Sequence, residues 1–159
     1  MLTQQDEQVI YEIYLRATSG LQDDFFGARS YLPWYQYVQA LSEVEQVVYL
    51  ILSMHDQVMN GGFNQYYVNR YGLFCYETVD KLQVIKSIEA KHILLKSIEV
   101  VDKDPSDHDK FRQMIYKNEY AHLYEDNLLE NQLYSLDDSY FRISETVLLN
   151  LAEYVRERN

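Results

Sequence analysis

Apolar residues recur every three or four positions through most of this chain, and helix-breaking residues are scarce. Only five glycines and two prolines occur among 159 residues. This spacing indicates helices with one buried face, because strands alternate with a period of two. A chain of this length can form one core and is short for two. The sequence predicts an all-α, single compact domain of six to eight helices without a repeat, in which residues 1–33 supply an N-terminal helix and a connector.

The most apolar helix is expected to begin at a capping box, Ser42-x-x-Glu45. Asn60 and Gly61 are expected to end it, because these residue types accept the positive φ found at helix ends. Gly62 is expected to let a new helix start close against the old one. This stretch is interpreted as a structural bend, and the alternative is a ligand pocket lined by amides and aromatics. The motif residues are Asn60, Gly61, Gly62, Phe63, Gln65, Tyr66 and Asn69.

Two acidic segments follow in the second half of the chain. Residues 102–110, with four aspartates and a proline, are expected to form an exposed loop. The last helix is expected to start at the Leu-Asp-Asp sequence 136–138, where Asp137 or Asp138 can serve as N-cap. Both segments therefore supply candidate surface carboxylates.

The charge balance excludes some partners. The net charge is −11, and residues 81–118 form the one net-positive segment, with 6 acids and 8 bases. Such a chain repels nucleic acid, so direct binding to DNA is not expected. A cationic partner is favoured instead, although acidic residues also serve solubility alone. The polar N-terminus and the absence of a long apolar run predict a cytoplasmic protein that does not enter the membrane.

A metal site is the main enzymatic alternative. Glu89-x-x-His92 and Glu119-x-x-His122 each place a carboxylate and an imidazole on one helix face, as in di-iron bundles. With 25 acids and 4 histidines in the chain, both pairs are explained by chance. His55 shares the apolar face of the central helix and is expected to be a hydrogen-bonded core residue. No catalytic residue, metal or cofactor is therefore predicted.

The order of these segments resembles that of a known family. The stretch "VMNGGFNQYYVNRYG" follows an apolar helix and precedes "AKHILLKSIEVVD" and "LYSLDDSYFRISETVLLNLAEYV". In this respect the chain is similar to the bacterial DNA-mimic protein family, and the likeness runs from about Trp34 to Tyr154. Residues 34–159 would then be a DNA-mimic-like helical domain. The resemblance implies an all-α fold, a homodimer and an acidic surface that occupies the DNA site of a transcription factor.

On this reading the protein is a non-enzymatic acidic binding protein whose partner is a basic DNA-binding protein. Helical carboxylates four residues apart rise about 6 Å, so two acidic rows must combine to imitate DNA. The candidate partner-binding residues are Asp102, Asp104, Asp107, Asp109, Glu125, Asp126, Glu130, Asp137 and Asp138. One alternative is an immunity protein that neutralises a basic toxin such as a nuclease. Another is a small metal-binding or enzymatic helical bundle. The 16 tyrosines, too many for one core to satisfy, favour a homodimer as well.

Overall fold

Eight α-helices and one 3-10 helix make up the described part of the computed structural model, which comprises residues 1–119 and 128–158. These residues contain no β-strand, so the predicted all-α fold is confirmed. The elements are α1 (Gln4–Thr18), α2 (Asp23–Gly27), α3 (Leu32–Ala40), α4 (Glu43–Val68), η1 (Tyr71–Phe74), α5 (Cys75–Val84), α6 (Ile88–Val101), α7 (His108–Tyr116) and α8 (Leu128–Arg156). None of the described helices combines the length and apolarity that crossing a membrane requires.

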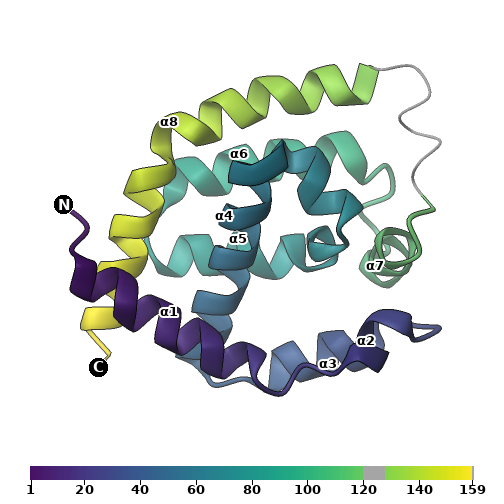
Figure 1. The fold of residues 1–159 in the computed structure, drawn as a ribbon. Helices are drawn as coiled ribbons and strands as arrows, with labels where there is room; N and C mark the ends of the chain where they lie inside the picture. The colour runs from purple at the N-terminus through teal and green to yellow at the C-terminus, as the bar shows by residue number, and fades with distance from the viewer. Residues whose placement is uncertain (120–127, 159) are drawn as a thin grey trace.

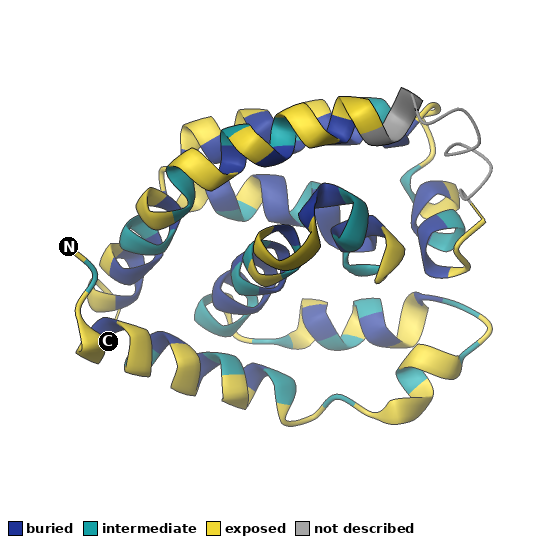
Figure 2. Ribbon diagram, turned by 45° about the horizontal axis from the view of Figure 1, so that its top comes forward, coloured by how far each residue is buried: buried dark blue, intermediate teal, exposed yellow. Residues whose placement is uncertain are grey.

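Helix α4 lies in the middle of the molecule, with α1 and α8 along its outer sides (Figure 1). The predicted capping box opens it: the Ser42 hydroxyl accepts from the Glu45 amide, and the Glu45 carboxylate accepts from the Ser42 amide. Its residues are mostly buried or half-buried, whereas the other helices turn exposed residues outward (Figure 2). The apolar residues of its first half that have no exposed surface are Val47, Val48, Ile51, Met54 and Val58. Helix α4 therefore forms the centre of one continuous core.

Helix α8 differs from the sequence prediction. It begins at Leu128 and passes through the Leu-Asp-Asp sequence without interruption, so the expected start at 136–138 is wrong. Leu133 and Tyr140, which are seven residues apart, are both buried, so one apolar face continues across the two aspartates. Aspartate costs only a few tenths of a kcal/mol within a helix, and this packing outweighs it.

A cluster of aromatic rings fixes the shorter helices to α4. Trp34 of α3 is 1% exposed and donates its indole N–H to the Tyr49 hydroxyl at 3.0 Å. Its ring meets Tyr71 and Phe74 edge to face, with centroids 5.4 and 5.1 Å apart. Such edge contacts are the favoured geometry between aromatic rings. The indole therefore holds α3, η1 and α4 together.

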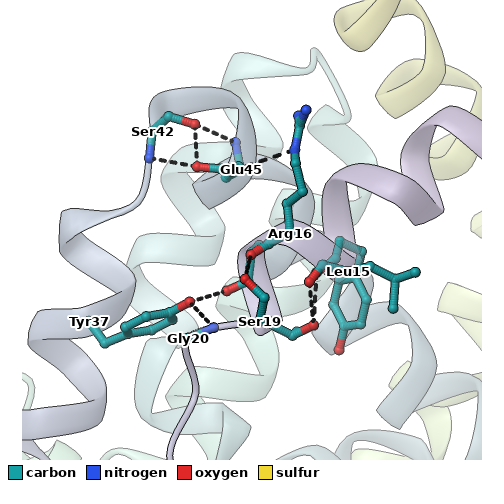
Figure 3. A network of polar contacts seen from close by, with 10 residues as sticks. Leu15, Arg16, Ser19, Gly20, Tyr37, Ser42 and Glu45 are labelled. Atoms are coloured by element: carbon teal, nitrogen blue, oxygen red, sulfur yellow. Dashed lines mark hydrogen bonds and ion pairs between the residues drawn. The ribbon is translucent and has the colours of Figure 1, made fainter.

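The N-terminal segment is tied to the rest of the chain by polar contacts (Figure 3). The Tyr37 hydroxyl of α3 donates to the Ala17 carbonyl at 2.6 Å and accepts from the Gly20 amide at 3.1 Å. At the opposite end of α1, Arg156 of α8 donates to the Asp6 carboxylate at 2.7 Å. This guanidinium holds the pKa of Asp6 well below its ordinary value. Both ends of α1 are thus bonded to other helices.

Removing the Tyr37 hydroxyl tests the first of these ties. Tyr37→Phe leaves the Ala17 carbonyl and the Gly20 amide without this partner, so we expect the free energy of unfolding to fall by about 1 kcal/mol. Urea denaturation measures this as a lower midpoint at an unchanged m-value. Tyr11→Phe is the matched control, because Tyr11 is 58% exposed. Equal urea midpoints for the two variants would show that the hydrogen bonds of the Tyr37 hydroxyl do not stabilise the fold.

Candidate functional site

The predicted glycine bend divides α4 into two helical halves. Gly61 has φ −149° and ψ 22°, and Gly62 has φ +73° and ψ −177°, both outside the helical range. The structural bend is therefore confirmed, but the positive φ lies at Gly62 rather than at Asn60 or Gly61. The second half begins at Phe63. Because the amides of a helix's first turn have no carbonyl one turn earlier, Phe63 requires an acceptor from elsewhere.

Asp137 of α8 supplies that acceptor. Its Oδ1 accepts the Phe63 amide hydrogen at 2.8 Å, although the two residues are 74 positions apart. A carboxylate near a helix N-terminus is the ordinary N-cap arrangement, here provided by a different helix. Asp137 is only 6% exposed. Burial raises its pKa, and the Phe63 N–H opposes that rise. The expectation that Asp137 is a surface carboxylate for a partner is wrong.

Gly62 is required here for two reasons. Its positive φ is strained for residues that carry a Cβ. A Cβ at this position would also overlap the Asp137 carboxylate, with Oδ2 as the nearest atom. The glycine thus permits both the bend and the close approach of α8. We call Gly62, Phe63 and Asp137 the trans-cap.

Four amide side chains lie beside the bend and bind one another. Gln57 accepts from Gln65 at 3.0 Å and from Asn69 at 2.7 Å, while Asn60 donates to Gln65 at 2.9 Å. A Cβ at Gly61 would overlap the Gln65 side chain. The cluster therefore closes the outside of the bend with hydrogen bonds that cross it.

The alternative ligand pocket is not assembled in the expected way. Tyr66 is 1% exposed and its hydroxyl lies 3.5 Å from that of Thr78, away from the amide cluster. Phe63 is fully buried and meets the Tyr140 ring edge to face. Of the residues proposed to line a pocket, Gln65 and Asn69 come together, whereas Tyr66 belongs to the core.

His55 lies on α4 about two helix turns before the bend. Its Nδ1 is 3.1 Å from the Tyr140 hydroxyl, so the predicted hydrogen bond is confirmed, and the side chain is half-buried. Burial lowers the pKa of the imidazole below its ordinary value of 6.5, and the nearby Asp56 carboxylate partly opposes this. His55 is therefore uncharged at neutral pH.

The two predicted Glu-His pairs do not form a metal centre within the described residues. Glu89 and His92 are both exposed on α6, and Glu119 is exposed after α7. His122 lies outside the described residues. Among the residues that the structure does describe, no group of three or more His, Cys, Asp or Glu side chains could hold a metal ion.

The acidic loop 102–110 is only partly a surface for a partner. Asp102 is 7% exposed and accepts from the Tyr76 hydroxyl at 2.6 Å, so its expected surface role is wrong. Asp107 accepts from the Lys110 amide and caps α7. Asp109 is exposed but accepts from the Tyr31 hydroxyl at 2.7 Å. Asp104, also exposed, accepts from the Ser106 hydroxyl.

Lysines share this end of the molecule. Lys103 and Lys110 line one cavity together with Asp102, Asp104 and Asp107. Lys96 and Lys103 also line a groove with Gln132 and Ser135 of α8. The loop carboxylates are therefore partly neutralised by neighbouring cations.

The remaining candidates lie on or before α8. Asp138 is exposed, next to the buried Asp137. Glu125 and Asp126 lie outside the described residues, as does the side chain of Glu130. Two further exposed carboxylates of α8, Glu145 and Glu153, join Asp138 on the outside of the helix. Both lie within the last helix that the sequence predicts, so the sequence alone already places them on this helix.

The fold and site define a class: a small all-α domain with a bent central helix, capped in trans by its last helix. Residues 39–158 match the family described as DMP19-like protein. Because this match covers well over half of the chain, the protein belongs to the DMP19-like family. The matched range contains the complete trans-cap and all of α8. No curated protein and no solved structure matches the chain.

Replacing Gly62 tests the requirement for glycine in the trans-cap. Gly62→Ala adds a Cβ at φ +73° that overlaps Asp137, so we expect a loss of at least about 2 kcal/mol of unfolding free energy. Gly27→Ala is the matched control, because nothing lies within 4 Å of a Cβ there. The measurement is urea denaturation of both variants. A Gly62→Ala protein as stable as the Gly27→Ala protein would refute the requirement.

The lowered pKa of His55 predicts a pH dependence. The unfolded chain binds a proton at His55 near its ordinary pKa of 6.5, whereas the folded chain binds it only at lower pH. Stability is therefore lost as the pH falls below about 6.5, by at most about 1.4 kcal/mol per pH unit for one proton. His55→Gln should remove this contribution. The measurement is the unfolding free energy of the wild type and of His55→Gln as a function of pH, between pH 7 and the folded pKa of His55. Parallel curves for the two proteins would contradict the assigned role of His55.

Proposed function

We propose that this protein is a non-enzymatic DNA mimic that occupies the DNA-binding surface of a transcription factor or another DNA-binding protein. Membership of the DMP19-like family and a net charge of −11 support the proposal. Both point to a cationic protein as partner, since a surface of this charge repels nucleic acid. This function places the protein in the cytoplasm, beside the DNA-binding proteins that it would inhibit.

The observation that carries the proposal is the spacing of the exposed carboxylates on α8. Asp138, Glu145 and Glu153 are seven and eight residues apart and all are exposed. These separations correspond to rises of about 10.5 and 12 Å along a helix. Three phosphate steps along one DNA strand rise about 10 Å. The α8 carboxylates thus match about every third phosphate, and Arg142 is the one basic residue in positions 131–155.

Acidic residues near the start of α8 would extend this row. Asp104 and Asp107 lie on the loop before α7 and Asp109 lies in its first turn. Lysines reduce the local negative charge there. We assign them to the edge of the proposed surface and α8 to its centre. The candidates Glu125, Asp126 and Glu130, which precede Asp138 in the chain, stay part of the proposed surface.

A homodimer is part of the proposal, because two copies would present two acidic rows. The tyrosine argument for it is weakened by the structure. Nine tyrosine hydroxyls have hydrogen-bond partners within the described chain, so one core satisfies more of them than expected. They belong to Tyr31, Tyr35, Tyr37, Tyr49, Tyr66, Tyr67, Tyr76, Tyr116 and Tyr140. The dimer therefore rests on the family resemblance.

Competition with DNA tests the proposal. A partner is first captured from a lysate of the native host and bound to a DNA fragment that it recognises. We expect the wild-type protein to displace the DNA. The variant Asp138→Asn, Glu145→Gln, Glu153→Gln should associate at least about tenfold more slowly at 0.1 M salt and lose this displacement. Raising the salt to 1 M should weaken wild-type binding, because the Debye length falls to about 3 Å.

The control carries the same change in charge elsewhere. Glu7→Gln, Glu12→Gln, Asp24→Asn neutralises three exposed carboxylates of α1 and α2 and should associate within about threefold of wild type. Salt-independent binding, or full displacement by the α8 variant, would contradict the proposal. Capture of a basic toxin that does not bind DNA would instead favour the immunity protein.

A further inference from the structure

Two aromatic rings are exposed on the outside of α8. Tyr134 is 59% exposed and Phe141 is 41% exposed, and seven residues separate them, so they lie on one side of the helix. Each is followed four residues later by an exposed carboxylate. The resulting row alternates ring, carboxylate, ring, carboxylate. These four side chains, the α8 strip, are Tyr134, Asp138, Phe141 and Glu145.

The strip has no partner within the part of the chain that the structure describes. Among the described residues, no aromatic side chain lies within stacking range of either ring, and no guanidinium lies over either of them. The side chains of the strip form no ion pair or hydrogen bond with described residues. Exposed aromatic rings that repeat along one helix face mark an interaction surface.

The protein shows elsewhere what fits between a ring and a carboxylate. The Arg112 guanidinium lies over the Tyr35 ring, 4.7 Å from its centroid, and pairs with Glu77 at 2.5 Å. Two further guanidinium groups lie over tyrosine rings, Arg158 over Tyr154 and Arg70 over Tyr116. The α8 strip presents the same two groups, a ring and a carboxylate, without the guanidinium. Arginine suits such a site better than lysine, because its planar guanidinium stacks and bonds at once.

A second copy of this chain fits the strip less well. Pairing two strips across a symmetric interface would bring Asp138 and Glu145 of one copy toward the same carboxylates of the other. Like charges in contact oppose association, and each copy already carries a net charge of −11. Charge complementarity therefore favours a cationic occupant.

We propose that the α8 strip is an arginine-binding surface that holds a cationic helix of the partner protein by stacking as well as by charge. This inference rests on the proposed function, since it names how the same helix recognises its partner. It predicts that binding discriminates arginine from lysine, which a purely electrostatic mimic of DNA would not do.

A pair of labelled helical peptides serves as the probe. Both are 15 residues long and contain four basic residues at a spacing of three and four, arginine in one peptide and lysine in the other. Fluorescence anisotropy at 0.15 M salt should show that the wild-type protein binds the arginine peptide about five- to twentyfold more tightly. The variant Tyr134→Ser, Phe141→Ser should lose this preference and retain its affinity for the lysine peptide within about threefold.

Two control variants make the test specific. Tyr11→Ser, Leu15→Ser removes two residues of α1 that are 58% and 48% exposed, and it should keep the arginine preference. Arg142→Gln removes the cation beside the strip and should tighten binding of both peptides. Equal affinity of the wild-type protein for the two peptides, or a preference that survives loss of both rings, would overturn the inference. So would a wild-type dimer that dissociates when the rings are removed, as measured by analytical ultracentrifugation.

DNA displacement separates this inference from the proposed function. If the ring variant displaces DNA from the captured partner as well as the wild type does, the strip is not the partner contact, whereas mimicry stands. If the wild-type protein displaces no DNA but shows a ring-dependent preference for arginine, DNA mimicry fails and the arginine-binding surface stands.

Discussion

The backbone amide of Phe63 must find an acceptor inside the protein, and much of the fold depends on how this is achieved. The bend at Gly62 interrupts the hydrogen-bond ladder of α4 where the chain is buried and water cannot replace the missing carbonyl. Asp137 of α8 provides the acceptor. An unsatisfied buried amide costs about 1–3 kcal/mol, so this bond fixes the position of α8 on α4.

The outside of α8 follows from that position. With Asp137 turned inward, Asp138 and Glu145 point outward, and Tyr140 is buried against His55 and Phe63. One helix therefore has two separate tasks. Its inner face completes the bend of α4, and its outer face presents the carboxylates and rings proposed to bind a partner. The Asn-Gly-Gly-Phe motif accordingly has a structural part in this protein, and the proposed function lies on the opposite face of a different helix.

Local interactions explain which parts of the fold the sequence predicts. A capping box joins residues three positions apart, so Ser42 marks the start of α4 correctly. The bend is also predictable from a local signal, because two adjacent glycines in the sequence indicate it. Asp137 was misassigned because the local rule for aspartate before an apolar run is an N-cap of the next helix. It is indeed a cap, but of a helix 74 residues away, and no local pattern distinguishes the two cases. The same applies to Asp102, whose partner Tyr76 is 26 residues distant.

The central claim is that Gly62 and Asp137 form one unit, and a double-mutant cycle in unfolding free energy tests it most directly. The single variants Gly62→Ala and Asp137→Ala should each destabilise the protein. Removing the carboxylate also removes the atoms that the new Cβ would overlap, so the double variant should lose at least about 1 kcal/mol less than the sum. Combining Gly62→Ala with Asp138→Ala, the exposed neighbour, should be additive. Additivity within about 0.5 kcal/mol for the Gly62 and Asp137 pair would contradict the claim.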